Sequence, residues 1–516
     1  MNLFQAISNN DPSSIAIVHA DRQITYDELR SDILATARAL TLLGVVPGER
    51  VALLLYDSPE FVAAFTAICS LRAIAVPINL ALRLEDQCSI LNNSGARLAL
   101  VEGDIRNALL TDALEKLRQL KDIVVVERNQ VQASPGSLKG LQAEAAATTL
   151  KEFADPAEHL QAFILYTSGS TGEPKGAVHT QRHIFYTNDT FCREVLRLTT
   201  ADRLFSSSRL PFAYGLGNSF TFPLLNGATA ILCSEKPTPE VIARVFNQCR
   251  PTIFFGVPVV YNLLLEHHRS GNKIDCSSLR LCVSAGEALP AHLGEEWEKE
   301  FGIQLLDGIG STEMLHMFMS NHQDDVRYGS SGKVLAGYEA RLLNENGEPV
   351  EGEGNLWIKG ESAAMGYWER PEETTRTFVD GWVRTGDLYR CDENGYWFHM
   401  GRSDDCFKSS GQWVSPVEVE GVLVRHEKVG RAAVVEDFDK DQLPCACAFV
   451  VCQDVESDPA VVEKELRDLA SASLPRFKQP RRYVFVDELP YTATGKIQRF
   501  KLRQSLRDLP CGSPVQ

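Results

Sequence analysis

A dense run of glycine and hydroxyl residues at 167–176, TSGSTGEPKG, has the composition of a phosphate-binding loop. Its glycines free the backbone to turn N–H groups inward, its hydroxyls add donors, and Lys175 supplies a cation, which together suit a chain of phosphate oxygens. The run is not the P-loop G-x-x-x-x-G-K-[ST], because its spacer and its ending differ. Pro174 disfavours a helix that starts inside the loop, so we do not expect a helix N-terminus to hold the anion. The expected phosphate ligands are Thr167, Ser168, Gly169, Ser170, Thr171, Gly172 and Lys175.

Apolar runs of strand length alternate with longer amphipathic stretches on both sides of this loop. The expected strands are 50–55, 163–166, 229–233, 252–256 and 281–284. The expected helices, which have helical periodicity and helix-compatible starts, are 60–71, 239–248 and 258–268. This alternation predicts an α/β fold of layers with largely buried parallel sheets.

The pattern changes after about residue 325 to short strands separated by turn signals such as Asn346-Gly347, which predicts a β-rich subdomain. Past Arg402, a small α+β unit is expected. Its elements are strands at 431–435, 445–451 and 482–486 and a helix at 459–473. We therefore expect a large N-terminal domain of layered α/β sheets at 1–403 and a small α+β C-terminal domain at 404–516.

The composition of the 516 residues, with 44% hydrophobic and 23% charged, is that of a globular protein of two or more domains. No apolar stretch approaches the ~20 residues of a membrane span, and the first residues lack the pattern of a secretory signal. The 13 cysteines are scattered without zinc-site spacing and are expected to be reduced thiols. The sequence thus predicts a cytoplasmic protein.

The charge is unevenly distributed. A net charge of −16 argues against general binding to nucleic acid or anionic lipid. Between residues 476 and 507, however, nine basic residues face only Asp487 and Glu488. This segment is either a docking face for a polyanion or a solvated surface helix with its loop. The nine residues are Arg476, Lys478, Arg481, Arg482, Lys496, Arg499, Lys501, Arg503 and Arg507.

The phosphate loop closely resembles that of the adenylate-forming superfamily, which includes acyl-CoA synthetases, luciferases and nonribosomal-peptide adenylation domains. Further motifs of that superfamily follow in order along nearly the whole chain. They are PFAYGLG at 211–217, SAGEALP at 284–290, DGIGSTE at 307–313, TGD at 385–387, GRSDDCFKSSG at 401–411 and PYTATGKIQR at 490–499. The segments FAYGLGN, DGIGSTEMLH and TATGKIQRFKLR look most like those of benzoate-CoA ligases.

The resemblance implies a reaction in two steps that uses ATP, Mg²⁺ and CoA. A carboxylate attacks the α-phosphate of ATP and forms an acyl-adenylate, and the CoA thiol then displaces AMP. Two anions must be held together in the first step, so cations are needed at the reacting centre. Lys496 matches the lysine that bridges the carboxylate and the α-phosphate. Thr312 and Glu313 match the residues that hold the α-phosphate and Mg²⁺, which prefers hard oxygen ligands.

The resemblance also implies the nucleotide contacts. Asp387 matches the carboxylate that accepts both ribose hydroxyls, and Arg402 matches a residue that reaches ribose and phosphate. Asp307, with Gly308 beside it, stands where relatives contact the adenine amine. The residues that would wall the base are Ser284, Gly286 and Glu287. Two positions depart from the common pattern: Ile309 stands where many relatives have an aromatic residue, and Gln181 stands where many have a histidine and is assigned no role.

The second step requires the small C-terminal domain to be mobile, and Asp404 matches the hinge residue of the superfamily. Gly401 and Ser403 beside it suit a hinge. After rotation, the segment with Lys408, Ser410, Gly411 and Gln412 would face CoA. Gly411 has no side chain to block the pantetheine arm. The alternative is that this segment is only an exposed turn of a β-hairpin.

The acid pocket is expected to be largely apolar. Its predicted lining is Phe212, Ala213, Tyr214, Ala285, Ile309, Gly310, Met314 and His316. An α-amino acid would need a buried partner for its ammonium group, so the pocket favours an aryl acid. Tyr214 with Ile309 would form a flat slot, and His316 is either packed in the core or bonded to the substrate. Benzoate and substituted benzoates, including 2-aminobenzoate (anthranilate), remain open as substrates.

Three alternatives to a CoA ligase remain. The same adenylation could load the phosphopantetheine arm of a free acyl carrier protein. The chain could also be a non-catalytic nucleotide-binding protein on this fold, although both Lys175 and Lys496 are present. Oxygenation of the luciferase type is compatible with the motifs. The sequence does not determine the oligomeric state.

Overall fold

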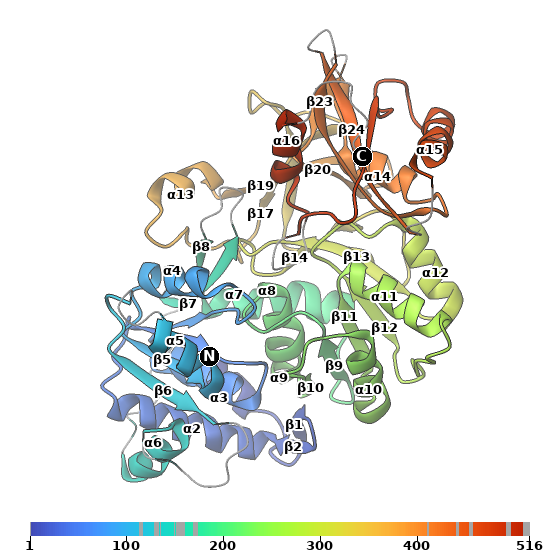
Figure 1. Ribbon diagram of the computed structural model, residues 1–516. Coiled ribbons are helices and arrows are strands. Elements are labelled where there is room, and N and C mark those ends of the chain that lie inside the picture. The colour runs from blue at the N-terminus through green and yellow to red at the C-terminus, as the bar shows by residue number, and fades with distance from the viewer. Residues whose placement is uncertain are drawn as a thin grey trace. The chain divides into compact units, whose positions relative to one another are not determined.

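A computed structural model describes residues 2–112, 117–127, 134, 136–148, 150, 160–168, 174–409, 412–439, 443–453, 458–491 and 497–508. The chain forms two compact units (Figure 1). Unit 1 comprises Met1–Ala340 and Ile358–Arg384, and unit 2 comprises Arg341–Trp357 and Thr385–Gln516. In the described part of the chain, no helix is long and apolar enough to cross a bilayer.

The first sheet of unit 1 carries the phosphate-loop segment. Among the described residues it has six strands, in the order β6 (Asp122–Val126), β5 (Leu98–Glu102), β3 (Arg50–Leu54), β4 (Ile74–Pro77), β7 (Gln161–Ser168) and β8 (Pro174–Thr180). All neighbours are parallel except β7 and β8, which form an antiparallel pair. The central strands are buried throughout, as their continuous apolar runs predict. The packing helices are α2 (Tyr26–Leu42) and α3 (Pro59–Ser70) in one core cluster and α4 (Leu84–Ser94) in another.

The second sheet of unit 1 is a nine-stranded sheet in the described residues. Its order is β15 (Lys333–Val334), β14 (Met317–Ser320), β13 (Leu305–Gly310), β12 (Leu281–Ser284), β11 (Ile253–Gly256), β9 (Arg203–Ser206), β10 (Thr229–Leu232), β1 (Ile15–His19) and β2 (Arg22–Thr25). The strands from β13 to β1 are parallel, so β12 and β13 end at the same edge. Ligands of open α/β sheets bind at this kind of edge.

Helices α10 (Pro239–Cys249), α11 (Pro258–Arg269) and α12 (Ala291–Phe301) lie along one face of this sheet (Figure 1). Phe246, Tyr261 and Trp297 are fully buried there. The remaining helices of unit 1 are α1 (Leu3–Ser8), α5 (Gly103–Asp112), α6 (Leu138–Glu144), α7 (Gln181–Thr187), α8 (Ala213–Leu216), α9 (Phe222–Leu225) and α13 (Pro371–Thr377). A short 3₁₀ turn spans Ala145–Ala147, and π-helical segments span Asn188–Leu196 and Gly217–Thr221.

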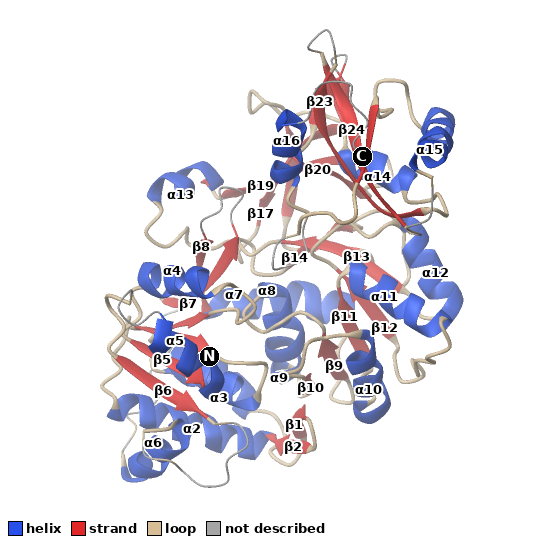
Figure 2. Cartoon of the chain, viewed as in Figure 1, coloured by secondary structure: helices blue, strands red, loops and turns tan. Residues whose placement is uncertain are grey.

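Unit 2 contains the expected α+β layer (Figure 2). Strands β23 (Val429–Phe438), β24 (Pro444–Cys452) and β25 (Arg482–Phe485) form one sheet. Helices α14 (Pro416–Leu423) and α15 (Pro459–Ser473) pack in one core cluster with it, and α16 (Arg499–Asp508) packs in another. A further sheet consists of β16 (Glu339–Leu343), β17 (Glu353–Lys359), β18 (Phe378–Val379), β19 (Trp382–Cys391) and β20 (Trp397–Arg402), and of these strands β20 lies entirely within unit 2. The hairpin of β21 (Phe407–Ser409) and β22 (Gln412–Val414) also belongs to unit 2.

The predicted α/β fold class is confirmed, and the expected strands and helices are present with ends shifted by a few residues at most. The boundary expected between residues 403 and 404 does not coincide with a border between the compact units. Residues Asp387 to Cys391 of β19 pair with β20, and all of these paired residues belong to unit 2. A movement about Asp404 remains a prediction.

Candidate active site

The phosphate-loop segment joins the two antiparallel strands β7 and β8. Thr167 pairs with Lys175 and Ser168 pairs with Pro174, so the loop closes a hairpin and does not lead into a helix. The next helix, α7, begins at Gln181. The Lys175 ammonium lies 5.7 Å from the centroid of the Tyr367 ring. Predicted ligands Gly169, Ser170, Thr171 and Gly172 fall outside the described residues.

The segment between β13 and β14 holds Thr312 and Glu313 in a tight turn. Tyr367 Oη donates a hydrogen bond of 2.6 Å to Glu313 Oε1, and Ala364 N donates one of 2.7 Å to the Glu313 carbonyl. The Thr312 carbonyl accepts from Leu315 N at 3.2 Å. Leu315 has a φ of 64°, a conformation that is strained for a residue with a side chain. Tyr367 thus holds the Glu313 carboxylate, and Ala364 holds the Glu313 backbone.

Ser284 is the last residue of β12 and is paired in register with Asp307 of the parallel strand β13. Both are buried, and burial raises the pKa of the Asp307 carboxyl well above its usual range. Leu289 N donates to Asp307 Oδ2 at 3.4 Å. Asp307 Oδ1 and Ser284 Oγ have no hydrogen-bond partner of acceptable distance and angle within the described residues. Buried polar atoms without partners are costly, so these two fit a ligand that offers hydrogen bonds, as adenine does.

The neighbours of this pair line the same strand ends. Gly286 and Glu287 are exposed in the turn after β12, whereas Ala285 is buried. Gly308 is buried in β13, and Ile309 and Gly310 are half-buried at its end.

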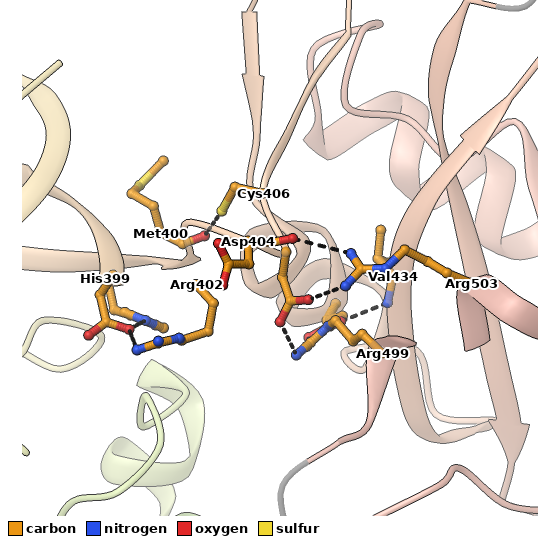
Figure 3. Close-up of polar contacts among 11 residues, drawn as sticks. His399, Met400, Arg402, Asp404, Cys406, Val434, Arg499 and Arg503 are labelled. Atoms are coloured by element: carbon orange, nitrogen blue, oxygen red, sulfur yellow. Dashed lines mark hydrogen bonds and ion pairs between the residues drawn. The ribbon is translucent and has the colours of Figure 1, made fainter. Parts of the chain in front are cut away.

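Asp387 on β19 contacts two basic side chains of β20, His399 and Arg402, both of which are labelled in Figure 3. Arg402 Nη1 lies 3.1 Å from Asp387 Oδ1 and also donates to the Thr385 carbonyl, while His399 Nε2 lies 3.5 Å from Asp387 Oδ1. Burial raises the pKa of the Asp387 carboxyl, but His399 and Arg402 lower it by more, so the net pKa is below its ordinary value. A β-bulge between Leu388 and Tyr389 shifts the register here, and such bulges re-aim side chains.

Gly386 explains how Arg402 reaches this carboxylate. Its φ is +76°, and a Cβ added at this position would lie 2.6 Å from Arg402 Nη2. A side chain at residue 386 would thus strain the backbone and displace the guanidinium. The glycine of the TGD motif is therefore explained by its positive φ and by the close approach of the Arg402 guanidinium.

Aromatic side chains gather around His316. Its ring centroid lies 5.7 Å from Tyr214, 4.6 Å from Phe222 and 5.0 Å from Phe191. His316 Nε2 and Asn218 Oδ1 are 3.2 Å apart, and Tyr214 Oη donates to the Val283 carbonyl at 3.0 Å. Burial lowers the pKa of His316 to about 3, so the ring is neutral at physiological pH.

The backbone near this cluster is π-helical. The segment Gly217–Thr221 directly follows α8, and a Cβ at Gly217 would lie 2.6 Å from His316 Cδ2. Single π-helical turns often occur at functional sites. Phe212 and Ala213 are half-buried at the start of α8, and Met314 is fully buried. The structure thus brings Tyr214 and His316 together, while a slot between Tyr214 and Ile309 remains a prediction.

Lys408 lies in the hairpin of β21 and β22, as the simpler interpretation of this segment predicted. Its ammonium donates to Glu345 Oε1 at 2.8 Å and lies 4.8 Å from the Trp413 ring centroid. Gln412 is exposed and pairs with Ser409. Ser410 and Gly411 lie outside the described residues, as does Lys496.

Asp404, the predicted hinge residue, lies beside an ionic network of unit 2 (Figure 3). Arg503 donates to the Asp404 carbonyl at 3.4 Å and to Asp405 Oδ1 at 2.8 Å. Arg499 donates to both oxygens of Glu420 at 2.8 Å. The segment that follows Lys496 is thereby tied to the hinge.

Acidic residues elsewhere in unit 2 neutralise much of the basic segment. The ion pairs are Lys478 with Glu418, Arg481 with Asp439, Arg482 with Asp437, Arg499 with Glu420 and Arg503 with Asp405. Because these ion pairs neutralise the basic side chains, they favour a solvated surface helix with its loop and argue against a docking face for a polyanion.

The sequence did not single out several residues that contact the site. Tyr367 binds Glu313, and His399 binds Asp387. His179 contacts the Thr312 carbonyl and His183. Gln181, which was assigned no role, accepts from Leu3 N and donates to the Cys69 carbonyl, so it joins α1 to the end of α3. Of these residues, His399 has a signal in the sequence, because it lies three positions before Arg402 of the GRSDD motif.

Comparison with known proteins finds similarity over most of the chain. A family model described as AMP-binding enzyme matches residues 4–368, and one described as AMP-binding enzyme C-terminal domain matches residues 418–496. The benzoate–CoA ligase of Thauera aromatica is 41% identical over 490 residues, which cover 93% of this chain and 90% of that protein.

Two crystal structures superpose on nearly the whole chain. The anthranilate CoA ligase AuaEII in complex with anthranoyl-AMP is 36% identical, with a TM-score of 0.91 and coverage of 98% of this chain and 97% of that one. A benzoate CoA ligase from Burkholderia xenovorans LB400 is 38% identical, with a TM-score of 0.87 and coverage of 98% and 100%. The chain therefore belongs to the AMP-binding enzyme family, within the adenylate-forming superfamily, and resembles its benzoate–CoA ligases.

Proposed function

We propose that this protein is an ATP-dependent, AMP-forming aryl acid–CoA ligase that acts on benzoate or on a substituted benzoate such as 2-aminobenzoate (anthranilate). The observation that carries the proposal is the full-length similarity to a benzoate–CoA ligase, at 41% identity over 93% of the chain. The aromatic surroundings of Tyr214 and the neutral His316 ring support it, because they suit a flat aryl group.

In the first half-reaction, a carboxylate oxygen of the acid attacks the α-phosphorus of ATP. A new acyl–oxygen–phosphorus bond forms, and the bond to the pyrophosphate leaving group breaks. The loop at 167–176 would hold the phosphates through backbone N–H groups, hydroxyls and Lys175. Lys496 would lie between the carboxylate and the α-phosphate, where its charge lowers the cost of bringing two anions together.

Asp307 and Ser284 would take the adenine end of the nucleotide, since their unpartnered oxygens suit its amine. Asp387, kept ionised by His399 and Arg402, would accept the ribose hydroxyls. Gly286, Glu287 and Gly308 would wall the base.

Magnesium fits the site as a partly phosphate-bound ion. Among the described residues, no group of three or more His, Cys, Asp or Glu side chains could hold a metal by itself. Magnesium in phosphate-transfer sites commonly takes one or two carboxylates, with phosphate oxygens and waters completing its shell. Glu313 is the carboxylate that would supply this contact, with Thr312 beside it, and the ion would neutralise phosphate charge.

In the second half-reaction, the sulfur of CoA attacks the acyl carbonyl carbon, a thioester bond forms and AMP leaves. We infer that unit 2 turns about Asp404 and exchanges Lys496 for the hairpin with Lys408 and Gln412. Ser410 and Gly411, between the two strands of that hairpin, would border the pantetheine arm, for which a glycine leaves space.

A substrate panel tests the proposal. Benzoate, aminobenzoates, hydroxybenzoates and short fatty acids are compared by CoA-dependent AMP release. An aryl acid should give the highest kcat/KM, and a medium-chain fatty acid that exceeds every aryl acid would refute the pocket assignment. The Lys496→Ala variant should lose adenylation, and full activity in that variant would show that Lys496 is not the residue that drives adenylation.

The acyl acceptor is tested by product analysis with CoA alone. Robust aryl-CoA formation supports the ligase, whereas adenylate that accumulates until a carrier protein is added supports loading of a phosphopantetheine arm. A reducing compartment, the cytoplasm, is consistent with the thiols, because no disulfide joins the cysteines in the described ranges.

A further inference from the structure

Two buried histidines form a hydrogen-bonded chain that ends on the turn with Thr312 and Glu313. His179 on β8 is fully buried, and His183 on α7 is 6% exposed. Their Nδ1 atoms are 2.9 Å apart, and His179 Nε2 lies 2.8 Å from the Thr312 carbonyl oxygen. Phe163 stacks on His179 at a centroid distance of 5.3 Å. The chain thus joins the strand after the phosphate loop to the turn that carries Glu313.

The partners determine the direction of each hydrogen bond. A carbonyl oxygen only accepts, so His179 Nε2 carries the hydrogen. Both rings are kept neutral by burial, as their lowered pKa values reflect. A neutral His179 with hydrogen on Nε2 can only accept at Nδ1, so His183 must donate from its own Nδ1. Hydrogen on His179 Nε2 and on His183 Nδ1 therefore satisfies both short contacts, the one between the two rings and the one to the Thr312 carbonyl. With this arrangement His183 Nδ1 cannot accept from Thr180 N, which lies 3.4 Å away.

The Thr312 carbonyl at the end of this chain stabilises a strained turn. It accepts from Leu315 N as well as from His179, so both of its lone pairs are used. Leu315, with its φ of 64°, lies just beyond Glu313 in the same turn. Loss of the His179 donor would leave a buried carbonyl short of one bond and release the constraint on a strained backbone.

We propose that His179 is a positioning residue for Thr312 and Glu313, and that His183 orients its imidazole for this purpose. Packing alone does not require a histidine at 179, since any flat ring could stack on Phe163. The hydrogen bond to the Thr312 carbonyl does require a donor at the end of the ring. The inference rests on the proposed function only in its assumption that Thr312 and Glu313 meet Mg²⁺ and ATP.

Matched variants separate positioning from packing. His179→Leu removes the donor, His179→Gln keeps one at the end of the side chain, and His183→Asn keeps the donor near the Nδ1 position. His19→Leu is the control, because His19 bonds Ser234 and not the Thr312 turn. Binding of ATP is measured by calorimetry over a magnesium titration without any acid, together with Tm.

His179→Leu should raise the magnesium concentration needed for ATP binding by about tenfold or more, as is usual when a partner behind a metal ligand is lost. His179→Gln and His183→Asn should stay within about threefold of the wild type, and His19→Leu should not change it. Wild-type magnesium dependence in His179→Leu, whatever its Tm, would overturn the proposal, and so would a His179→Gln variant as impaired as the leucine variant. Because no acid is present, failure of the substrate panel is distinguishable from failure of this test.

The unmodified protein offers a second measurement should His179→Leu not fold. Long-range ¹⁵N–¹H spectra of ¹⁵N-histidine-labelled protein distinguish which ring nitrogen carries the hydrogen, and spectra of His179→Gln and His183→Asn assign the two signals. We expect His179 with hydrogen on Nε2 and His183 with hydrogen on Nδ1. A His183 ring with hydrogen only on Nε2 would reverse the chain and contradict the proposal.

Discussion

At the scale of single residues, neighbouring side chains set the charge or the orientation of the candidate site residues Asp387, Glu313 and Lys408. His399 and Arg402 keep Asp387 ionised although it is buried. Tyr367 orients Glu313 through a 2.6 Å hydrogen bond. Glu345 holds the ammonium of Lys408 in the structure described. Each of these pairs makes the behaviour of one side chain depend on another.

Nucleotide binding should resist acid because of Arg402. The lowered pKa of Asp387 means that this carboxylate stays ionised until the pH falls below its ordinary titration range near 4. Arg402→Met removes a cation, raises that pKa and should move the acidic loss of AMP affinity to higher pH. AMP affinities of the wild type and the variant, measured by calorimetry between pH 4 and 8, would check this. If the affinity of both proteins falls at the same acidic pH, Arg402 does not keep Asp387 ionised.

Lys408 should matter for only one half-reaction. Lys408→Ala is expected to slow thioester formation by at least about tenfold, the effect of one lost charged hydrogen bond, and to leave pyrophosphate exchange nearly unchanged. The matched control is Glu345→Gln, which releases the ammonium without removing it. If pyrophosphate exchange falls as far as overall turnover, Lys408 does not have the proposed role.

At the scale of elements, helix α16 is anchored by an ion pair that is largely withdrawn from water. The side chains of Arg499 and Glu420 are 14% and 13% exposed, and Glu420 also accepts from Val434 N at 2.7 Å. The pair thus joins α16, α14 and β23. Because α16 starts shortly after Lys496 in the sequence, its anchorage limits where that lysine can move.

Removing one partner of this pair should be more harmful than removing both charges. Glu420→Gln keeps an acceptor for Val434 but leaves Arg499 with only the longer 3.7 Å contact to Asp405, at a cost of about 3 kcal/mol. The double variant Arg499→Met with Glu420→Gln should regain most of that stability. Arg503→Gln, at the more exposed pair with Asp405, should cost about 1 kcal/mol or less. Chemical denaturation followed in unit 2 measures these differences, and equal costs for Glu420→Gln and the double variant would contradict a buried-charge effect.

At the scale of the whole molecule, the proposed reaction requires one chain to present two different surfaces to the same adenylate. Asp404 lies directly after strand β20 and beside the network of Arg499 and Arg503. That network ties Asp404 and Asp405 to α16, so we expect the backbone change of a rotation to occur at or before Asp404 and not after it.

Asp404→Pro tests this movement. Proline fixes φ near −65°, which should block rotation and slow thioester formation by about 100-fold or more, while adenylation stays within about threefold. Asp404→Ala keeps the backbone free and should behave like the wild type. Single-turnover thioester formation from preformed adenylate is the measurement, and a proline variant that is slowed equally in both steps would argue against a hinge here.

What the sequence by itself determined was local. The strands and helices follow from apolar periodicity and from starting residues such as Ser58 and Pro59, and the phosphate loop follows from glycine and hydroxyl spacing within ten residues. The resemblance of its motifs then identified adenylate-forming chemistry. These signals can be recognised because each depends on near neighbours in the chain.

Tertiary structure alone decided which side chains support the site. Tyr367 and Glu313 are 54 residues apart, and His179 and Thr312 are 133 apart, so neither contact has a spacing rule. The same applies to the basic segment near the C-terminus, whose charges pair with acids of α14 and β23 that lie far away in the sequence. A contact between strands and loops depends on how whole sheets pack, and that packing is the sum of many burial terms that no short motif encodes.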